Sequence, residues 1–339
     1  MDRYSRQQLF APIGERGQQS IREKHVLLIG AGALGAANAE TLVRAGIGKI
    51  TIIDRDYVEW SNLQRQQLYT EEDATNRLPK AIAAAMHLRA INGDVVVEPI
   101  VADADARLLE HVVARERPHV IIDSTDNFDV RMIINDVSQK YDVPWIYGAC
   151  VGSYGLSYVI VPNETPCLRC LLEDVPLGVA TCDTVGIISP VVHMVVAHQT
   201  AEALKILVGD KRINRKLVSF DVWHGQYRMI DVHKLKKDDC PSCSERRTYP
   251  ALQYENETKF AVLCGRETVQ IRPAHRGERE WTTLLSFLTK RGIQVEQNDY
   301  LFSFTVDSHR FVVFFDGRVL IHGTNDVQEA KRLYYQYLG

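Results

Sequence analysis

The sequence predicts an α/β protein with a Rossmann-like, doubly wound mixed sheet, an antiparallel C-terminal part, and a small α+β domain after it. Three observations predict this class. A glycine motif, Gly30-Ala31-Gly32-Ala33-Leu34-Gly35, follows a continuous apolar run. Strand-like runs then alternate with helical segments as far as residue 150. Two Cys-x-x-Cys pairs, Cys167/Cys170 and Cys240/Cys243, have the spacing of a structural four-cysteine zinc site.

The first elements form a βαβ unit. The run 25–29 is apolar after its first residue, His25, which is typical of a strand buried on both faces. The segment 36–45 is expected to be a helix that ends at Gly46, and a second buried strand is expected at 49–54. Such a crossover makes the strands parallel. The same reasoning predicts helices near 79–91, 108–115 and 128–141, and strands at 95–101, 120–123 and 145–149.

After residue 152 the pattern changes. A strand at 156–161, a long helix at 191–207 and a closing antiparallel hairpin, 217–222 with 227–232, lead to the second cysteine pair. Residues 249–339 are expected to form the small α+β domain, so the first domain comprises residues 1–248. Its expected strands are 260–263, 268–272, 301–306 and 311–315, with a turn at Asp316-Gly317, and its expected helices are 281–291 and 327–338.

Composition excludes several classes of protein. The 339 residues carry a net charge of −3, with 45% hydrophobic and 24% charged residues, so the basic footprint of a nucleic-acid-binding protein is missing. The N-terminal residues lack the apolar core of a signal peptide, and the run 185–197 is too short to span a bilayer. We expect a cytoplasmic protein that acts away from membranes. Its seven cysteines then suit metal and thiol chemistry better than disulfides.

The glycine motif predicts a nucleotide site, because backbone amides at a helix N-terminus bind phosphates. Asp54 ends the next strand, where a carboxylate accepts hydrogen bonds from ribose hydroxyls. These features fit NAD, FAD and ATP alike. Three further residues, Arg65, Lys80 and Asp126, favour a triphosphate, because cations neutralise phosphates and a carboxylate holds Mg²⁺. Taken singly, each also fits a solvated helix face or a strand-end cap.

At this point the chain resembles the ThiF/MoeB/HesA family, bacterial relatives of ubiquitin-activating enzymes. The resemblance covers roughly residues 3–245 and depends on ordered motifs. They are Arg3-Tyr4-Ser5-Arg6-Gln7, the glycine motif, Asp54-Arg55-Asp56, Ser61-Asn62-Leu63-Gln64-Arg65-Gln66, Pro79-Lys80, Ser124-Thr125-Asp126-Asn127 and the two cysteine pairs. It implies an ATP-dependent adenylyltransferase that activates the C-terminal glycine of a ubiquitin-fold sulfur carrier ending in Gly-Gly.

The resemblance also implies roles for individual residues. Gly32 and Gly35 would contact the phosphates and Asp54 the ribose. Asn62, Arg65 and Lys80 would orient or neutralise the triphosphate, and Asp126 would hold Mg²⁺. Arg6 would reach into the site of a neighbouring subunit, which implies a homodimer. The structural zinc ligands would be Cys167, Cys170, Cys240 and Cys243.

Several alternatives stay open from the sequence. The carrier is either ThiS-like, for thiazole and thiamine synthesis, or MoaD-like, for molybdopterin synthesis; Cys182 and the C-terminal extension favour the first. Cys182 either joins the carrier through sulfur or is a plain thiol. A cysteine desulfurase or rhodanese-type protein is a candidate sulfur donor. Two other classes compete with the adenylyltransferase: an oxidoreductase with structural zinc, and a non-catalytic scaffold. Binding of ATP with Mg²⁺, compared with binding of NAD(H), distinguishes the oxidoreductase from the adenylyltransferase.

Overall fold

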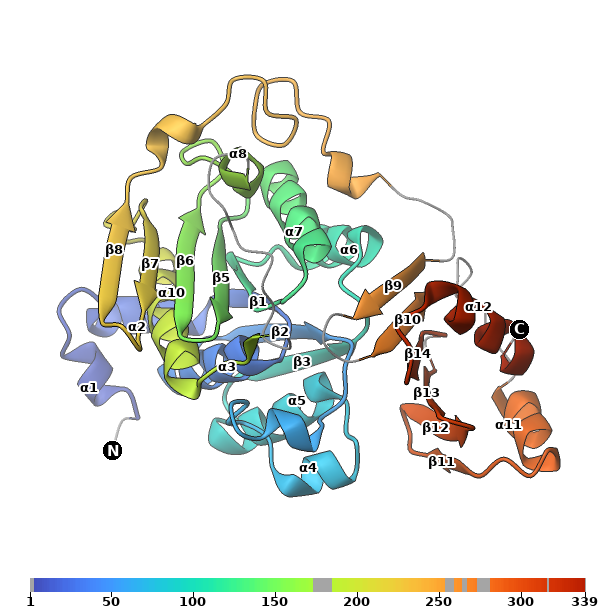
Figure 1. Cartoon of the computed structure of the whole chain (residues 1–339). Helices are drawn as coiled ribbons and strands as arrows, with labels where there is room; N and C mark the ends of the chain where they lie inside the picture. Colours follow the sequence, from blue (N-terminus) through green and yellow to red (C-terminus); the bar gives the residue numbers. More distant parts are fainter. Residues whose placement is uncertain are drawn as a thin grey trace. The chain divides into compact units, whose positions relative to one another are not determined.

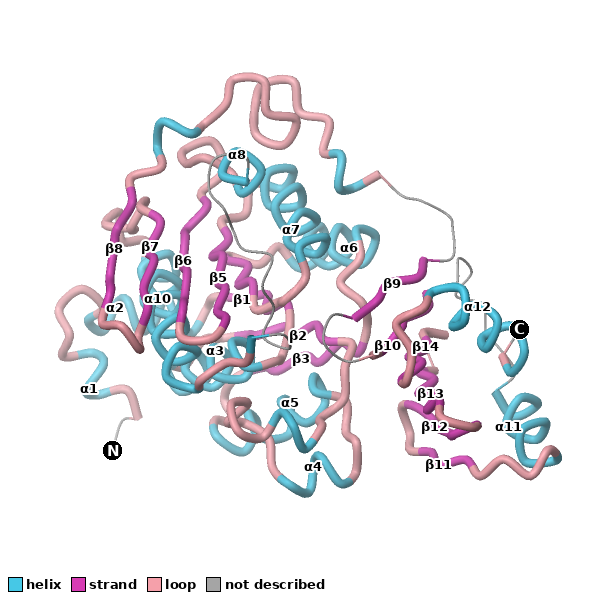
Figure 2. The backbone as a smooth tube through the Cα atoms, viewed as in Figure 1, coloured by secondary structure: helices cyan, strands magenta, loops and turns pink. Residues whose placement is uncertain are grey.

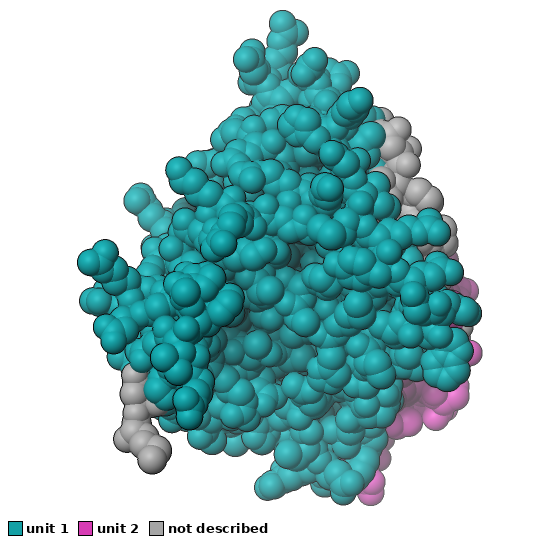
Figure 3. Space-filling model, turned by 90° about the vertical axis from the view of Figure 1, so that its left-hand side faces the viewer, with its two compact units in different colours: residues 1–180, 187–254 teal, residues 181–186, 255–339 magenta. Residues whose placement is uncertain are grey.

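The chain divides into two compact units, which Figure 3 shows in different colours: residues 1–180 with 187–254, and residues 181–186 with 255–339. They are seen in a computed structural model that describes residues 3–172, 185–253, 259–263, 267–272, 281–315 and 317–338. The domain boundary expected between residues 248 and 249 stays a prediction. Cys182 lies outside the described residues.

Among its described residues, the first unit contains an eight-stranded sheet of order β3-β2-β1-β4-β5-β6-β7-β8 (Figure 1). The first five strands in this order are parallel and contain the predicted βαβ unit. The elements of this half are β1 (His25–Ile29), α3 (Ala33–Ala45), β2 (Lys49–Asp54), α5 (Lys80–Ile91), β3 (Val96–Val101), α6 (Ala106–Glu116), β4 (Val120–Asp123), α7 (Phe128–Tyr141) and β5 (Trp145–Val151).

The other half of the sheet is antiparallel, and this confirms the predicted mixed topology. It comprises β6 (Tyr154–Ile160), β7 (Leu217–Asp221) and β8 (Gln226–Ile230), each paired antiparallel with the strand before it. The order β3-β2-β1-β4-β5 reverses direction between β1 and β4. Ligands of open α/β sheets bind at such a switch point, beyond the carboxyl ends of the strands.

Helices cover both faces of this sheet (Figure 2). On one face α2 (Gly14–Arg22), α3, α5 and α10 (Ser189–Val208) share a core with the even-numbered residues of β1, such as Val26 and Leu28. On the other face α6, α7 and α8 (Leu168–Leu172) pack with Leu27 and Ile29. The alternation follows from the two-residue period of a strand. The short elements α1 (Ser5–Gln8), α4 (Glu71–Thr75), η1 (Trp60–Asn62), η2 (His233–Leu235) and η3 (Pro250–Leu252) complete the unit.

Helix α10 is central to the first unit. By length and composition it is the one helix among the described residues that could cross a membrane, with a mean hydropathy of 1.2 over 18 residues. Half of that window is buried inside the protein, where the helix packs on α3, β5 and β6. Its apolar character is therefore explained by its place in the core.

The second unit is α+β, as the sequence predicts. Its described strands form an antiparallel sheet of order β11-β12-β13-β14-β10-β9. Aromatic side chains fill its core, where Phe302, Phe304 and Phe311 pack with Leu333 and Tyr334 of α12. The sequence did not indicate the short strands β11 and β14. The elements are β9 (Lys259–Leu263), β10 (Thr268–Arg272), α11 (Trp281–Lys290), β11 (Val295–Gln297), β12 (Leu301–Val306), β13 (His309–Phe314), β14 (Val319–His322) and α12 (Val327–Tyr337).

A partly buried charged cluster lies at the amino ends of the parallel strands. His25 Nε2 is 2.9 Å from Thr51 Oγ1 and 3.6 Å from Glu116 Oε2, and Lys49 Nζ is 2.8 Å from the same carboxylate oxygen. A groove of about 580 Å³ opens here. The glycine motif begins at the opposite end of β1, so this groove is not the nucleotide site predicted from the sequence.

Stability is expected to fall with acid because of His25. Burial lowers the pKa of His25 below its ordinary value of 6.5. Below pH 6.5 the unfolded chain therefore binds a proton that the folded chain resists, and the free energy of unfolding decreases as the pH falls. We expect His25→Gln to reduce the difference in urea unfolding free energy between pH 7.5 and 5.5. His111→Gln, at an exposed histidine of α6, is the control. Equal pH dependence in wild type and His25→Gln would contradict this account.

Candidate active site

The glycine motif connects β1 to the N-terminus of α3, at the switch point of the sheet. Gly30 has a φ of 91°, and a Cβ there would lie 2.6 Å from the Ser124 carbonyl oxygen. A Cβ at Gly35 would lie 2.0 Å from the Gly30 carbonyl oxygen. Both glycines are thus required for close packing. Gly32 precedes the first turn of α3, whose leading N–H groups lack partners within the helix and can bind an anion.

Asp54 fixes the position of this loop. Its Oδ2 accepts a hydrogen bond from the Ala31 amide at 2.6 Å, and its Oδ1 accepts one from the Asp56 amide at 2.6 Å. Burial raises the pKa of the carboxyl group, and the positive charge of Lys80 opposes that shift. The carboxylate therefore lies beside the glycine loop, where the sequence predicts the ribose contact.

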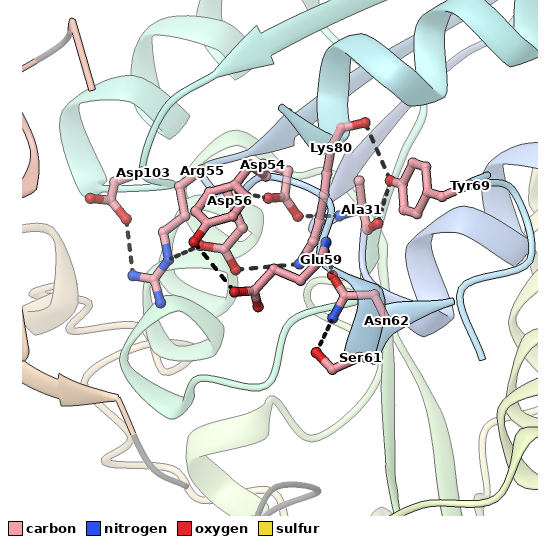
Figure 4. Close-up of polar contacts among 11 residues, drawn as sticks. Ala31, Asp54, Arg55, Asp56, Glu59, Ser61, Asn62, Tyr69, Lys80 and Asp103 are labelled. Carbon is pink, nitrogen blue, oxygen red and sulfur yellow. Dashed lines mark hydrogen bonds and ion pairs between the residues drawn. The ribbon is translucent and has the colours of Figure 1, made fainter. Parts of the chain in front are cut away.

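Lys80 is buried at the first residue of α5 and points toward the end of β2 (Figure 4). Its Nζ lies 3.4 Å from Asp56 Oδ2, and its amide donates to the Asp56 carbonyl oxygen at 2.8 Å. The guanidinium of Arg55 is 3.6 Å from Asp56 and 3.1 Å from Asp103. Tyr69 contacts the glycine loop beside this cluster, because its hydroxyl donates to the Ala31 carbonyl oxygen at 2.6 Å.

The segment after η1 places an amide beside the glycine loop. Asn62 is buried, and its Oδ1 accepts from the Glu59 amide at 3.1 Å. Arg65 folds back so that NH1 donates to the Ser61 carbonyl oxygen at 2.8 Å. Gln66 is buried with an Oε1 that has no hydrogen-bond partner, and its Nε2 would lie 3.9 Å from a Cβ on Gly32. An orphaned polar atom at this place fits a bound ligand.

Asp126 lies on the loop that follows β4 and is exposed. It is near enough to interact electrostatically with both Arg55 and Arg131. Arg131 is buried on α7, donates from Nε to Asp123 Oδ2 at 3.0 Å, and also donates to the Thr125 and Gly148 carbonyl oxygens. Burial raises the pKa of Asp123, and Arg131 opposes that shift. Arg131 therefore holds the loop that presents Asp126.

Arg6 lies outside this cluster of its own chain. The N-terminal segment contacts the far ends of α3 and α5: Gln7 donates to the Ala45 carbonyl oxygen and Arg3 to that of Ile91. The glycine loop is at the other end of α3, roughly 20 Å away for a helix of this length.

Sequence reasoning missed Arg55, Asp56, Gln66, Tyr69 and Arg131 as site residues. Asp54-Arg55-Asp56 gave the clearest signal, since three charged residues occupy the end of a buried strand and the two positions directly after it.

The four cysteines converge on the opposite face of the sheet from α10. Their sulfurs lie within 4.8 Å of one another and are buried. The distances from Cys167 to Cys170 and Cys240 are 3.8 and 3.6 Å, and Cys170 to Cys243 is 3.5 Å. A tetrahedron with metal–sulfur bonds of about 2.3 Å has edges of about 3.8 Å. The cysteine cluster therefore has the geometry of a closed metal site, and these four residues fit zinc.

Together these features are those of an α/β protein with a glycine loop and a charged cluster at the sheet's switch point, and with four cysteines in the geometry of a metal site. The chain belongs to the ThiF family, whose match covers residues 4–242. The resemblance seen in the sequence is thereby confirmed.

Individual relatives support the same assignment. The chain is 51% identical to the sulfur carrier protein ThiS adenylyltransferase of Bacillus subtilis, over 99% of both chains. It is 34% identical to the protein of that name from Escherichia coli, over 73% of this chain and 97% of the relative. It is 32% identical to the Escherichia coli molybdopterin-synthase adenylyltransferase, over 72% and 97%. A crystal structure of Escherichia coli MccB matches with a TM-score of 0.62 at 21% identity, over 72% and 75%, which shows the shared fold.

Proposed function

We propose that this protein is an ATP-dependent adenylyltransferase that activates the C-terminal glycine of a ThiS-like sulfur carrier and releases pyrophosphate. The observation that carries the proposal is the convergence of the glycine loop, Asp54 and Lys80 at the switch point of the sheet. The full-length relative named for ThiS supports that carrier. A MoaD-like carrier, in molybdopterin synthesis, is the second candidate, because a molybdopterin-synthase relative also matches.

The nucleotide would bind with its phosphates on the first amides of α3 and its ribose at Asp54. Gly32 offers the open approach, whereas Gly35 keeps the loop packed on Gly30. The unpartnered oxygen of Gln66 would accept a hydrogen bond from the bound ligand. Asn62 holds the turn from which Arg65 and Gln66 extend.

The reaction depends on charge more than on proton transfer. A carboxylate is already a nucleophile at neutral pH, so the carrier's C-terminus can attack the α-phosphorus while pyrophosphate leaves on the opposite side. Lys80 and Arg65 would neutralise the negative charge that builds on the departing oxygens, an effect worth several kcal/mol in a site that excludes water. Mg²⁺, held by Asp126, would supply further charge neutralisation at the phosphates. Asp126 fits that role as an exposed carboxylate beside two arginines.

Two further roles extend beyond one chain. Arg6 would serve the site of a partner subunit in a homodimer, which agrees with its place at the far ends of α3 and α5. Cys182 would join the activated carrier through sulfur: its thiolate would attack the carbonyl carbon of the adenylate and displace AMP. A cysteine desulfurase or rhodanese-type protein would be the sulfur donor. We place the whole reaction in the cytoplasm, in thiamine biosynthesis.

The four cysteines would hold structural Zn²⁺, because a site closed by four sulfurs leaves no position for substrate.

The identity of the carrier is tested directly. The enzyme is incubated with ATP, Mg²⁺ and either purified ThiS or purified MoaD, and the carrier mass is measured. We expect an adenylate, a gain of one AMP less water, on ThiS and little on MoaD. ThiS truncated by its last glycine is the matched control and should stay unmodified. Adenylate on MoaD alone would transfer the proposal to the second carrier, and adenylate on neither would overturn it.

A further inference from the structure

Gln199 is a fully buried polar residue on the core-facing side of α10. Its neighbours on this side of the helix, Val195, Val196 and Ala203, are apolar. Burying an amide without hydrogen-bond partners is unfavourable, so a glutamine here is retained for its contacts. None of the nucleotide contacts proposed above uses it.

The amide of Gln199 connects three elements. Its Nε2 donates to the carbonyl oxygens of Asp123 at 2.7 Å and Ile146 at 3.2 Å, which belong to β4 and β5. Its Oε1 accepts from Asn38 Nδ2 at 2.8 Å, on α3. Because a carbonyl oxygen only accepts hydrogen bonds, these contacts determine which way the amide faces.

Asn38 carries the connection to the nucleotide loop and to the loop after β4. Its Nδ2 also lies 3.0 Å from the Leu34 carbonyl oxygen, in the first turn of α3, and 3.4 Å from Ser124 Oγ. Ser124 is the first residue after β4 and lies two positions before Asp126. One pair of buried amides thus joins α10, the start of α3 and the loop that presents Asp126.

The sheet leaves space for the Gln199 amide at Gly148. A Cβ on Gly148 would lie 2.3 Å from Gln199 Nε2, so only glycine leaves room for the amide. The ladder between β4 and β5 pairs Ile121 with Trp145 and Ile122 with Ile146, and there it ends. Gln199 therefore donates to one carbonyl group of each strand at this end of the β4–β5 ladder.

We propose that Gln199, acting through Asn38, is a positioning residue for the adenylation reaction. It holds the start of α3 and the loop 124–127 at a fixed separation, so that phosphates on the glycine loop would meet a Mg²⁺ held by Asp126. This inference rests on the proposed function, which assigns the glycine loop and Asp126 those two ligands.

The test compares two variants of neighbouring buried residues. Gln199→Met keeps the length of the side chain but removes the amide. Thr200→Val is the matched control, because the Thr200 hydroxyl donates only to carbonyl groups of its own helix. We expect Gln199→Met to weaken equilibrium binding of Mg–ATP by about 10- to 100-fold, as loss of an indirect supporting contact does at other metal sites. Thr200→Val should change it by no more than about twofold.

A double variant separates positioning from general loosening of the core. If the two amides act as one unit, adding Asn38→Leu to Gln199→Met costs little beyond the single change, and the effects do not multiply. If Gln199→Met does not fold, Asn38→Leu alone is compared with Thr200→Val, and the same weakening of Mg–ATP binding is expected. Binding by Gln199→Met equal to that by Thr200→Val, or two effects that multiply, would overturn the proposal. The assay uses no carrier, so absence of carrier adenylate in the wild type counts against the proposed function alone.

Discussion

Replacing Lys80 with methionine is expected to reduce carrier-dependent ATP–pyrophosphate exchange by about 10²- to 10³-fold, with most of the loss in kcat. The lysine is buried at the start of α5, and its Nζ is held toward the phosphate site by Asp56 at 3.4 Å. Its charge acts on oxygens that become more negative as pyrophosphate departs. Methionine keeps the apolar stem packed, so folding should survive. Exchange kinetics and the thermal unfolding midpoint, measured on one preparation, give both quantities.

The control for this prediction is Lys211→Met, an exposed lysine beyond the end of α10. It removes the same charge from the protein without touching the site, and we expect exchange within about twofold of wild type. Lys80→Arg should recover only part of the activity, because a planar guanidinium does not place its charge where an ammonium does. Exchange by Lys80→Met at near wild-type rate would remove Lys80 from the mechanism.

Much of the fold was predictable because local signals and long-range packing agree. A buried parallel strand favours apolar residues, and β1 and β2 begin and end where the sequence predicts them. Gly46 ends α3 in a left-handed conformation, as a C-terminal glycine predicts. Short elements were missed for the opposite reason. The strand β14, four residues long, is stabilised by pairing with β13 and β10, which no local pattern reveals.

The sequence predicted that several candidate site residues lie near one another, but it did not predict their individual contacts. Lys80 lies close to Asp54 as expected, because a bridge between Tyr57 and Pro79 brings the start of α5 to the end of β2. The partners of these residues depend on side-chain direction, which tertiary packing determines. The sequence therefore did not show that Arg65 bonds to its own turn, or that Gln199 reaches β4 from a helix 76 residues later.

The cysteine cluster shows why chemistry predicts some distant contacts well. Cys167 and Cys240 are 73 positions apart, yet the sequence predicted their meeting. Paired thiols with two residues between them have few uses in one chain, and four thiolates complete a tetrahedral site. A set of metal ligands thus constrains the fold more tightly than an apolar residue does, since an apolar side chain can pack against many different apolar partners.

Replacing Cys170 with alanine is expected to release the metal and lower the free energy of unfolding by on the order of 5 kcal/mol. The cluster joins α8 to the segment around Cys240, and contacts around it extend to α7. The Leu168 amide donates to Asn135 Oδ1 at 2.8 Å, and Arg169 Nε donates to Ser242 Oγ at 2.8 Å. Without metal, three buried thiols remain in a space shaped for an ion, and these contacts lose their anchor. Metal content and urea unfolding of the purified variant measure the two effects.

Cys150→Ala is the matched control, because Cys150 is a half-buried cysteine outside the cluster. It should keep its zinc and lose no more than about 1 kcal/mol. Wild-type protein purified without zinc, or a Cys170→Ala variant that keeps both its metal and its stability, would contradict the assignment. A graded result is also informative, since α7 begins directly after the loop that presents Asp126. Metal loss that weakens Mg–ATP binding before the chain unfolds would show that the cluster stabilises the nucleotide site through α7.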